Sequence, residues 1–244
     1  MKLATTSRRA LLRTLALASA VGPTLGRLAA STVHAQETTM PSADQALALL
    51  LDGNARYVSG TPVGPRRTVD RRTQVAGGQA PYATILSCAD SRVPPELVFD
   101  AGLGDLFVHR VAGNVLNEEL LGSIEYGAEH LHVPLIMVLG HERCGAVEAT
   151  VQAATQGAQF DGHIPSLARA ILPAVERVRG LPGDLVDNAI RANVALVVEQ
   201  LTARSPLLAA MAQRDEVQIV GAYYSLQTGQ VAVFAGPTGA GEGR

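Results

Sequence analysis

Apolar positions fall into short continuous runs and into helix-spaced patterns along the chain. Three runs have the length and composition of buried strands, at residues 82–88, 106–110 and 134–140. Helical spacing predicts helices at 42–57, 117–132, 144–156, 166–179, 184–204 and 206–213, with Ser42 as the first cap. Two more strands are expected at 217–224 and 230–235, while the prolines, arginines and paired glycines of 60–80 predict an extended arm or loop.

Strands that alternate with helices in this order predict an α/β fold. We expect a mostly parallel central sheet flanked by helices, preceded by an N-terminal helical arm. A single domain would then span residues 42–236, followed by a Gly-rich flexible tail at 237–244. From residue 42 onward no apolar run is long enough to span a bilayer, so no membrane span is expected there.

The first 35 residues have the pattern of an export signal. Paired arginines, Arg8 and Arg9, precede a mildly apolar stretch, and small residues before position 36 suit a cleavage site. This order is typical of a twin-arginine signal peptide, with 36–41 as a short linker and a periplasmic or secreted product. The alternative, an amphipathic first helix, is disfavoured by Gly22, Pro23 and Gly26, which would break it.

The net charge of the chain bears on which partners are expected. The formal net charge is −2, but the first 35 residues carry five basic and no acidic side chains. Without them the chain has 15 basic against 22 acidic residues, a net charge of −7. Nucleic acid is therefore not an expected partner, because phosphate binding depends on basic surface.

The two cysteines each follow a predicted buried strand. Cys88 ends the strand at 82–88, His141 follows the strand at 134–140, and Cys144 comes three residues later at a predicted helix start. Parallel sheets place their sites at the carboxyl ends of strands, so these three side chains can converge. Two thiolates and one imidazole suit Zn²⁺, one per chain, and leave a fourth position open, as catalytic zinc requires.

A carboxylate and a guanidinium lie close to these ligands in the sequence. Asp90 and Arg92 follow Cys88 closely, and a guanidinium can hold a carboxylate ionised through two hydrogen bonds. Such a carboxylate can accept a hydrogen bond from the nucleophile. Gly145 lets the backbone after Cys144 approach a substrate closely.

Two motifs carry a resemblance to a known family. The segment Cys88-Ala89-Asp90-Ser91-Arg92, together with His141-Glu142-Arg143-Cys144-Gly145, resembles the paired motifs of the β-carbonic anhydrases. The resemblance covers about residues 44–235. It implies that the Cys–His–Cys set binds zinc and that the Asp–Arg dyad orients a zinc-bound hydroxide for attack on carbon dioxide. It also implies substrate-side roles for Gln79, Phe107 and Tyr126.

The same resemblance implies a homodimer or a higher homo-oligomer. The N-terminal helix and the arm at 60–80 would embrace the partner, and Gln79 would reach the neighbouring pocket. The expected small-molecule substrate is carbon dioxide, with bicarbonate as its product.

Three alternatives remain open from the residues. The cysteines of an exported protein could form a disulfide instead of a metal site, although this would leave His141 and the Asp–Arg pair unexplained. The same site could hydrolyse carbonyl sulfide or carbon disulfide. A non-catalytic zinc protein would bind the metal without chemistry, but a structural site is normally closed by a fourth protein ligand.

Overall fold

A computed structural model describes residues 40–235, so the predicted export signal, most of the linker and the tail lie outside the described residues. The elements follow as α1 (Ala43–Val58), α2 (Val69–Val75), β1 (Ala83–Ser87), α3 (Pro95–Val98), β2 (Leu106–Arg110), the short 3₁₀ helix η1 (Ala112–Asn114), α4 (Glu118–His130), β3 (Leu135–His141), α5 (Gly145–Gln156), α6 (Ile164–Val178), α7 (Leu185–Arg204), α8 (Pro206–Gln213), β4 (Gln218–Tyr224) and β5 (Val231–Ala235).

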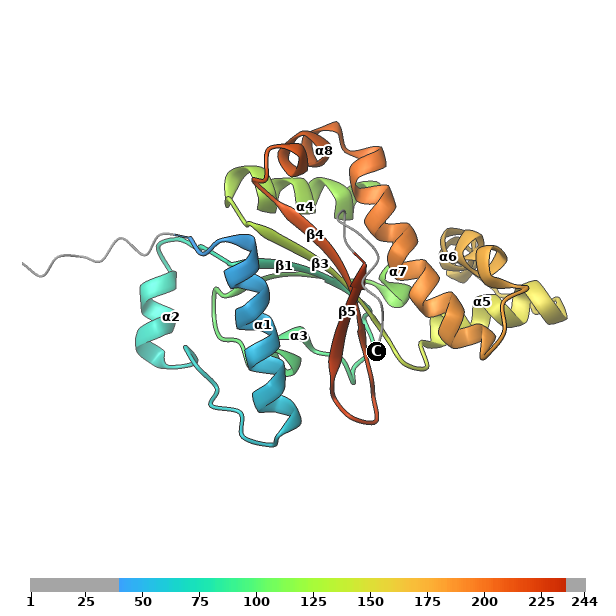
Figure 1. Cartoon of the computed structure of the whole chain (residues 1–244), viewed down its shortest axis with the longest axis horizontal. Helices are drawn as coiled ribbons and strands as arrows, with labels where there is room; N and C mark the ends of the chain where they lie inside the picture. Colours follow the sequence, from blue (N-terminus) through green and yellow to red (C-terminus); the bar gives the residue numbers. More distant parts are fainter. Residues whose placement is uncertain (1–39, 236–244) are drawn as a thin grey trace, which may run out of the picture. The chain divides into compact units, whose positions relative to one another are not determined.

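The sheet has the strand order β2-β1-β3-β4-β5 (Figure 1). The strands β2, β1, β3 and β4 are parallel, and β5 alone runs antiparallel, beside β4. All residues of β1 and β3 are buried, which agrees with the buried strands predicted at 82–88 and 134–140. The predicted mostly parallel α/β fold is confirmed.

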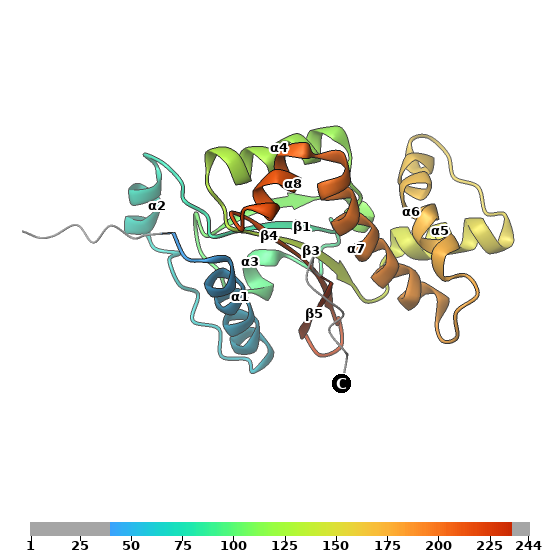
Figure 2. The same ribbon diagram turned by 45° about the horizontal axis from the view of Figure 1, so that its top comes forward.

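Helices cover the sheet on both faces (Figure 2). On one face, α1 and α3 pack through Leu50 and Val98 against Ile85 and Met137. On the other face, α4, α7 and α8 pack against strand residues such as Leu86. Because side chains alternate along a strand, neighbouring residues such as Ile85 and Leu86 belong to different cores.

A third core lies where α5, α6 and α7 pack together beside the carboxyl ends of the strands. It contains both cysteines and apolar residues from all three helices, among them Val147, Ile171 and Ile190. The thiols are thus set into apolar packing instead of lying on an open surface.

The arm contains an element that its sequence did not predict. Residues 69–75 form α2, which begins at a Thr68 cap and has no buried residue. The expectation of a loop throughout 60–80 is wrong there. The helix is placed by charge, because Arg66 and Arg71, which flank its start, lie 2.6 and 3.8 Å from the buried carboxylate of Asp105. The short elements α3 and η1 were also not expected.

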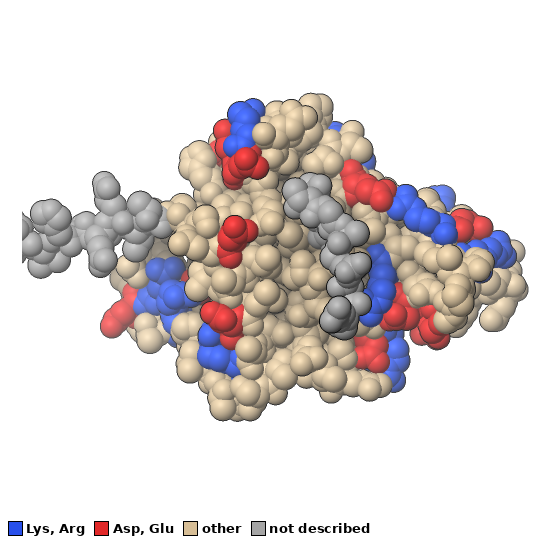
Figure 3. Space-filling view, in the orientation of Figure 1, with Lys and Arg blue, Asp and Glu red and all other residues tan. Residues whose placement is uncertain are grey.

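Surface charge is arranged in mixed groups. On the face drawn in Figure 3, acidic and basic side chains lie beside one another at several places. Ion pairs on α6 and α7, such as Arg177 with Glu199, have this character. Among residues 40–235 no single helix is long and apolar enough to cross a membrane, and the pair α7–α8, which passes by length and composition, is bent by 96°.

Candidate metal centre

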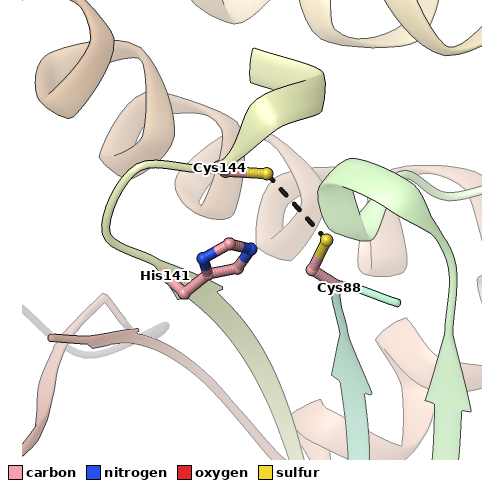
Figure 4. A group of neighbouring side chains, drawn as sticks. All are labelled: Cys88, His141 and Cys144. Atoms are coloured by element: carbon pink, nitrogen blue, oxygen red, sulfur yellow. Dashed lines mark hydrogen bonds between the residues drawn. The ribbon is translucent and has the colours of Figure 1, made fainter. Parts of the chain in front are cut away.

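Three segments bring the proposed ligands together. Cys88 directly follows β1, His141 ends β3, and Cys144 caps the start of α5. Because β1 and β3 are neighbouring parallel strands, their carboxyl ends meet at one edge of the sheet. The three ligand atoms lie within 4.8 Å of one another, and the side chains point toward a common centre (Figure 4).

The two cysteines are free thiols. Their sulfur atoms are 3.9 Å apart, whereas a disulfide requires about 2.0 Å. Hydrogen bonding from the Cys144 thiol, together with the Gly113 N–H, lowers the pKa of Cys88 to about 4. The hydrogen bond with Cys88, burial and the adjacent negative charge raise the pKa of Cys144. A metal ion that binds the two sulfurs would displace the proton that they share in this contact.

His141 is oriented by its own neighbour. Its Nδ1 lies 2.9 Å from the Glu142 carbonyl oxygen, which can only accept, so Nδ1 carries the proton and Nε2 has a free lone pair. Nε2 is buried and has no hydrogen-bond partner in the described part of the chain. Burial alone would lower the pKa of His141, but the negative charge of Cys88 helps to outweigh burial, and the pKa is raised. An unpaired buried nitrogen that faces two sulfurs fits a site for a metal ion.

The donor set fits zinc in particular. Two sulfurs and one imidazole nitrogen are ligands that zinc prefers, and three protein ligands are typical of catalytic zinc. Groups that orient the ligands are also present, since the Glu142 carbonyl oxygen fixes His141 and the Gly113 N–H donates to the Cys88 sulfur at 3.3 Å.

Asp90 and Arg92 form a tight pair beside this centre. Arg92 donates from Nε to Oδ1 at 2.9 Å and from Nη2 to Oδ2 at 2.7 Å, and its backbone N–H also donates to Oδ1. These bonds lower the pKa of Asp90 to about 2. Asp90 Oδ2 lies 3.9 Å from His141 Nε2, so an ionised acceptor lies beside the candidate metal site.

The remaining predicted site residues occupy different places. Gly145 is the exposed first residue of α5, and a Cβ added there would meet nothing within 4 Å. Gln79 is exposed in the segment between α2 and β1. Phe107 pairs in register with Thr84, four residues before Cys88, which corresponds to roughly 13 Å along the strand.

Tyr126 accompanies Phe107. The two rings have centroids 6.3 Å apart, and Tyr126 is 48% exposed on α4. A single chain therefore brings the Cys–His–Cys set and the Asp–Arg dyad together but leaves Phe107 well away from its own metal centre.

The sequence reasoning missed several groups that hold the site. Arg110 donates to the carbonyl oxygens of Cys88 and Asp90 and so fixes the loop between them. Asn193 of α7 donates to the carbonyl oxygen of Gly113 at 2.9 Å. The Gly113-Asn114 dipeptide after β2 is a turn signal that could have indicated this loop. No local pattern indicates Asn193.

Comparison with known proteins gives a consistent result. The family described as carbonic anhydrase matches residues 83–231. Carbonic anhydrase 2 of Mycobacterium tuberculosis is 41% identical over 184 residues, which cover 75% of this chain and 89% of the relative.

Two solved structures extend the match to the fold. The β-carbonic anhydrase CcaA is 25% identical, with a TM-score of 0.60 over 82% of this chain and 94% of its own. Tetrameric β-carbonic anhydrases from Sordaria macrospora are similar in fold, with a TM-score of 0.63 at 20% identity over 80% of this chain and all of theirs.

Proposed function

The chain belongs to the carbonic anhydrase family and to its β class, and on that premise we propose a zinc-dependent mechanism for the hydration of carbon dioxide to bicarbonate and a proton. The metal ligands are Cys88, His141 and Cys144. The observation that carries this assignment is the buried, unpaired Nε2 of His141 beside two free thiols. Zinc held there would lower the pKa of a water molecule to about 7 and so supply a nucleophile at neutral pH.

Asp90 orients the nucleophile. Its carboxylate is ionised across the neutral range because Arg92 binds both of its oxygens. A carboxylate that carries no proton can only accept a hydrogen bond, so it turns the proton of the nucleophile toward itself and a lone pair toward the substrate. Arg92 acts through Asp90: by occupying the carboxylate it also keeps Asp90 from turning to the metal.

The substrate side of the pocket needs a second copy of the chain. Open space lies beside Gly145, so its backbone can face a substrate bound at the metal centre of the same chain. Phe107 belongs to β2, which has its free edge at the margin of the sheet, and lies away from its own Cys88. We therefore assign Phe107, Tyr126 and Gln79 to the pocket of a partner subunit in a homodimer or larger homo-oligomer. The exposure of Tyr126 and Gln79 supports this assignment.

Export is part of the proposal. The paired arginines and the apolar stretch that follows them support passage through a twin-arginine route to the periplasm or the exterior. That route carries folded proteins, so zinc could bind the reduced thiols before the chain leaves the cytoplasm.

The variant Asp90→Asn separates metal binding from catalysis. Its amide keeps the shape of the side chain but presents a donor where the nucleophile needs an acceptor. We expect one zinc per chain by elemental analysis, as in the unmodified protein, together with a fall of about 100-fold or more in the rate of carbon dioxide hydration. Unchanged hydration in Asp90→Asn would refute the role of Asp90, and unmodified zinc-loaded protein that acts neither on carbon dioxide nor on carbonyl sulfide or carbon disulfide would be a non-catalytic zinc protein.

A further inference from the structure

The hydrogen bond to the Cys88 sulfur comes from a strained turn. Gly113 lies in η1 with φ of 72°, and Asn114 follows with φ of 42°. A Cβ on Gly113 would lie 2.7 Å from Ile171 Cδ1 and 3.1 Å from Ala146 Cβ. The turn thus packs between α6 and the first turn of α5, its positive φ favours glycine, and it presents its N–H to the sulfur at 3.3 Å.

A single side chain on α7, that of Asn193, is hydrogen bonded to this turn. Asn193 is 1% exposed, and its Nδ2 donates to the Gly113 carbonyl oxygen at 2.9 Å across 80 residues of sequence. Its Oδ1 is buried and has no partner among residues 40–235. The neighbours on this helix, such as Ile190 and Val194, are apolar. A buried amide is unfavourable in such a setting unless it is hydrogen bonded, so the bond to Gly113 is the polar interaction that compensates for its burial.

We propose that Asn193 is a positioning residue for the metal centre, acting through Gly113 to hold the N–H on the Cys88 sulfur. The bond to the carbonyl fixes the peptide that follows Gly113 and, with the packing around the glycine, its unusual φ. An N–H group directed at a thiolate orients the sulfur and withdraws electron density from it, which tunes the bond to the metal. The inference rests on the proposed zinc function and adds a residue of α7 to it.

The test compares two buried asparagines. Asn193→Leu keeps the branched shape of the side chain and removes the donor. Asn54→Leu is the matched control, because Asn54 is also buried and also donates to backbone carbonyls, those of Val98 and Gly229, in the core between α1 and the sheet. Zinc affinity is measured by competition with a chromophoric chelator, and the thiolate-to-metal charge-transfer band is measured after substitution with Co²⁺.

We expect Asn193→Leu to bind zinc about 10- to 100-fold more weakly and to shift the charge-transfer band. Asn54→Leu should lower thermal stability but leave both metal readouts as in the unmodified protein. Asn193→Ala, which removes the same donor without added apolar bulk, is measured alongside in case the leucine variant does not fold.

Unchanged affinity and an unchanged band in the Asn193 variants would overturn the inference, as would equal losses in the Asn54 control. The unmodified protein serves as the separate check on the proposed function. If it fails to bind zinc, the metal centre itself is refuted, whereas zinc binding that is insensitive to Asn193 refutes only the positioning role.

Discussion

At the scale of single residues, the state of each site group follows from the atom it faces. The carbonyl oxygen of Glu142 accepts a hydrogen bond from the Nδ1–H of His141 and leaves Nε2 free to bind a metal. Leaving a buried nitrogen unpaired costs about 1–3 kcal/mol, which metal binding would recover. Arg92 in turn keeps Asp90 ionised and fixes its direction. The site therefore combines a neutral nitrogen ligand with a charged acceptor a few ångströms away.

The bidentate contact of Arg92 with Asp90 gives a prediction. Lysine carries the same charge but cannot bind both carboxylate oxygens in one plane. We expect Arg92→Lys to keep its zinc and to lose about 100-fold in kcat for carbon dioxide hydration, because Asp90 loses its orientation. The matched control is Arg177→Lys, since Arg177 also makes a bidentate contact, with Glu199, on the surface of α6 and α7. Equal activity in the two lysine variants would contradict this role.

At the scale of elements, buried carboxylates hold the arm to the domain. The side chain of Asp100 is fully buried and accepts hydrogen bonds from Arg56 Nε and from the backbone N–H groups of Val63 and Gly64. Asp105 binds Arg66 in the same way. The arm helix α2 buries none of its residues. Ion pairs therefore hold the arm at 60–80 in place, and this is the segment that the family resemblance predicts to contact the partner subunit.

A variant of Asp100 tests this view through pH. Burial opposes ionisation of Asp100, but Arg56 and the two N–H groups outweigh it, and its pKa lies below the usual 3.9. Because the folded pKa is below the unfolded one, the stabilisation is complete above about pH 4 and is lost as pH falls through the folded pKa. Asn can keep the left-handed backbone of Asp100, with φ of 43°, without the charge.

We expect Asp100→Asn to be less stable by about 3 kcal/mol at pH 7 in urea unfolding of the zinc-free protein. The difference should shrink as the pH is lowered below 4. Asp52→Asn, an exposed change on α1, serves as the control and should have little effect at either pH. A loss in Asp100→Asn that stays constant with pH would show that the charge of this carboxylate does not hold the arm.

At the scale of the whole molecule, the sequence predicted those features of the fold and of the site that depend on local patterns of residues. The strands of continuous apolar residues and the helices with clear caps lie close to their predicted bounds, and Cys88, His141 and Cys144 converge because parallel strands end together. The arm helix was missed because it has no apolar face. The bond from Asn193 to Gly113 joins positions 80 residues apart, and such contacts leave no mark in local spacing.

The assignment of Phe107 to a partner's pocket gives a prediction for mixed oligomers. Phe107→Ala should be weakly active because both pockets of a dimer lose a wall, and Cys88→Ser should be inactive because the metal centre lacks a ligand. In a mixed dimer, the Phe107→Ala chain supplies an intact metal centre and the Cys88→Ser chain supplies the missing Phe107. We expect co-refolding of the two variants to yield more activity than either alone in stopped-flow assays. Activity no higher than the average of the separate variants would contradict a shared pocket.

The most direct measurement is stopped-flow hydration of carbon dioxide by the zinc-loaded, reduced chain from Gln36 onward, as a function of pH. We expect a fast rate that rises through an ionisation near pH 7, as a water on zinc requires. It should be abolished by chelation and restored by added zinc. The absence of hydration in reduced protein that holds one zinc per chain would contradict the proposed function and would direct attention to carbonyl sulfide and carbon disulfide as substrates.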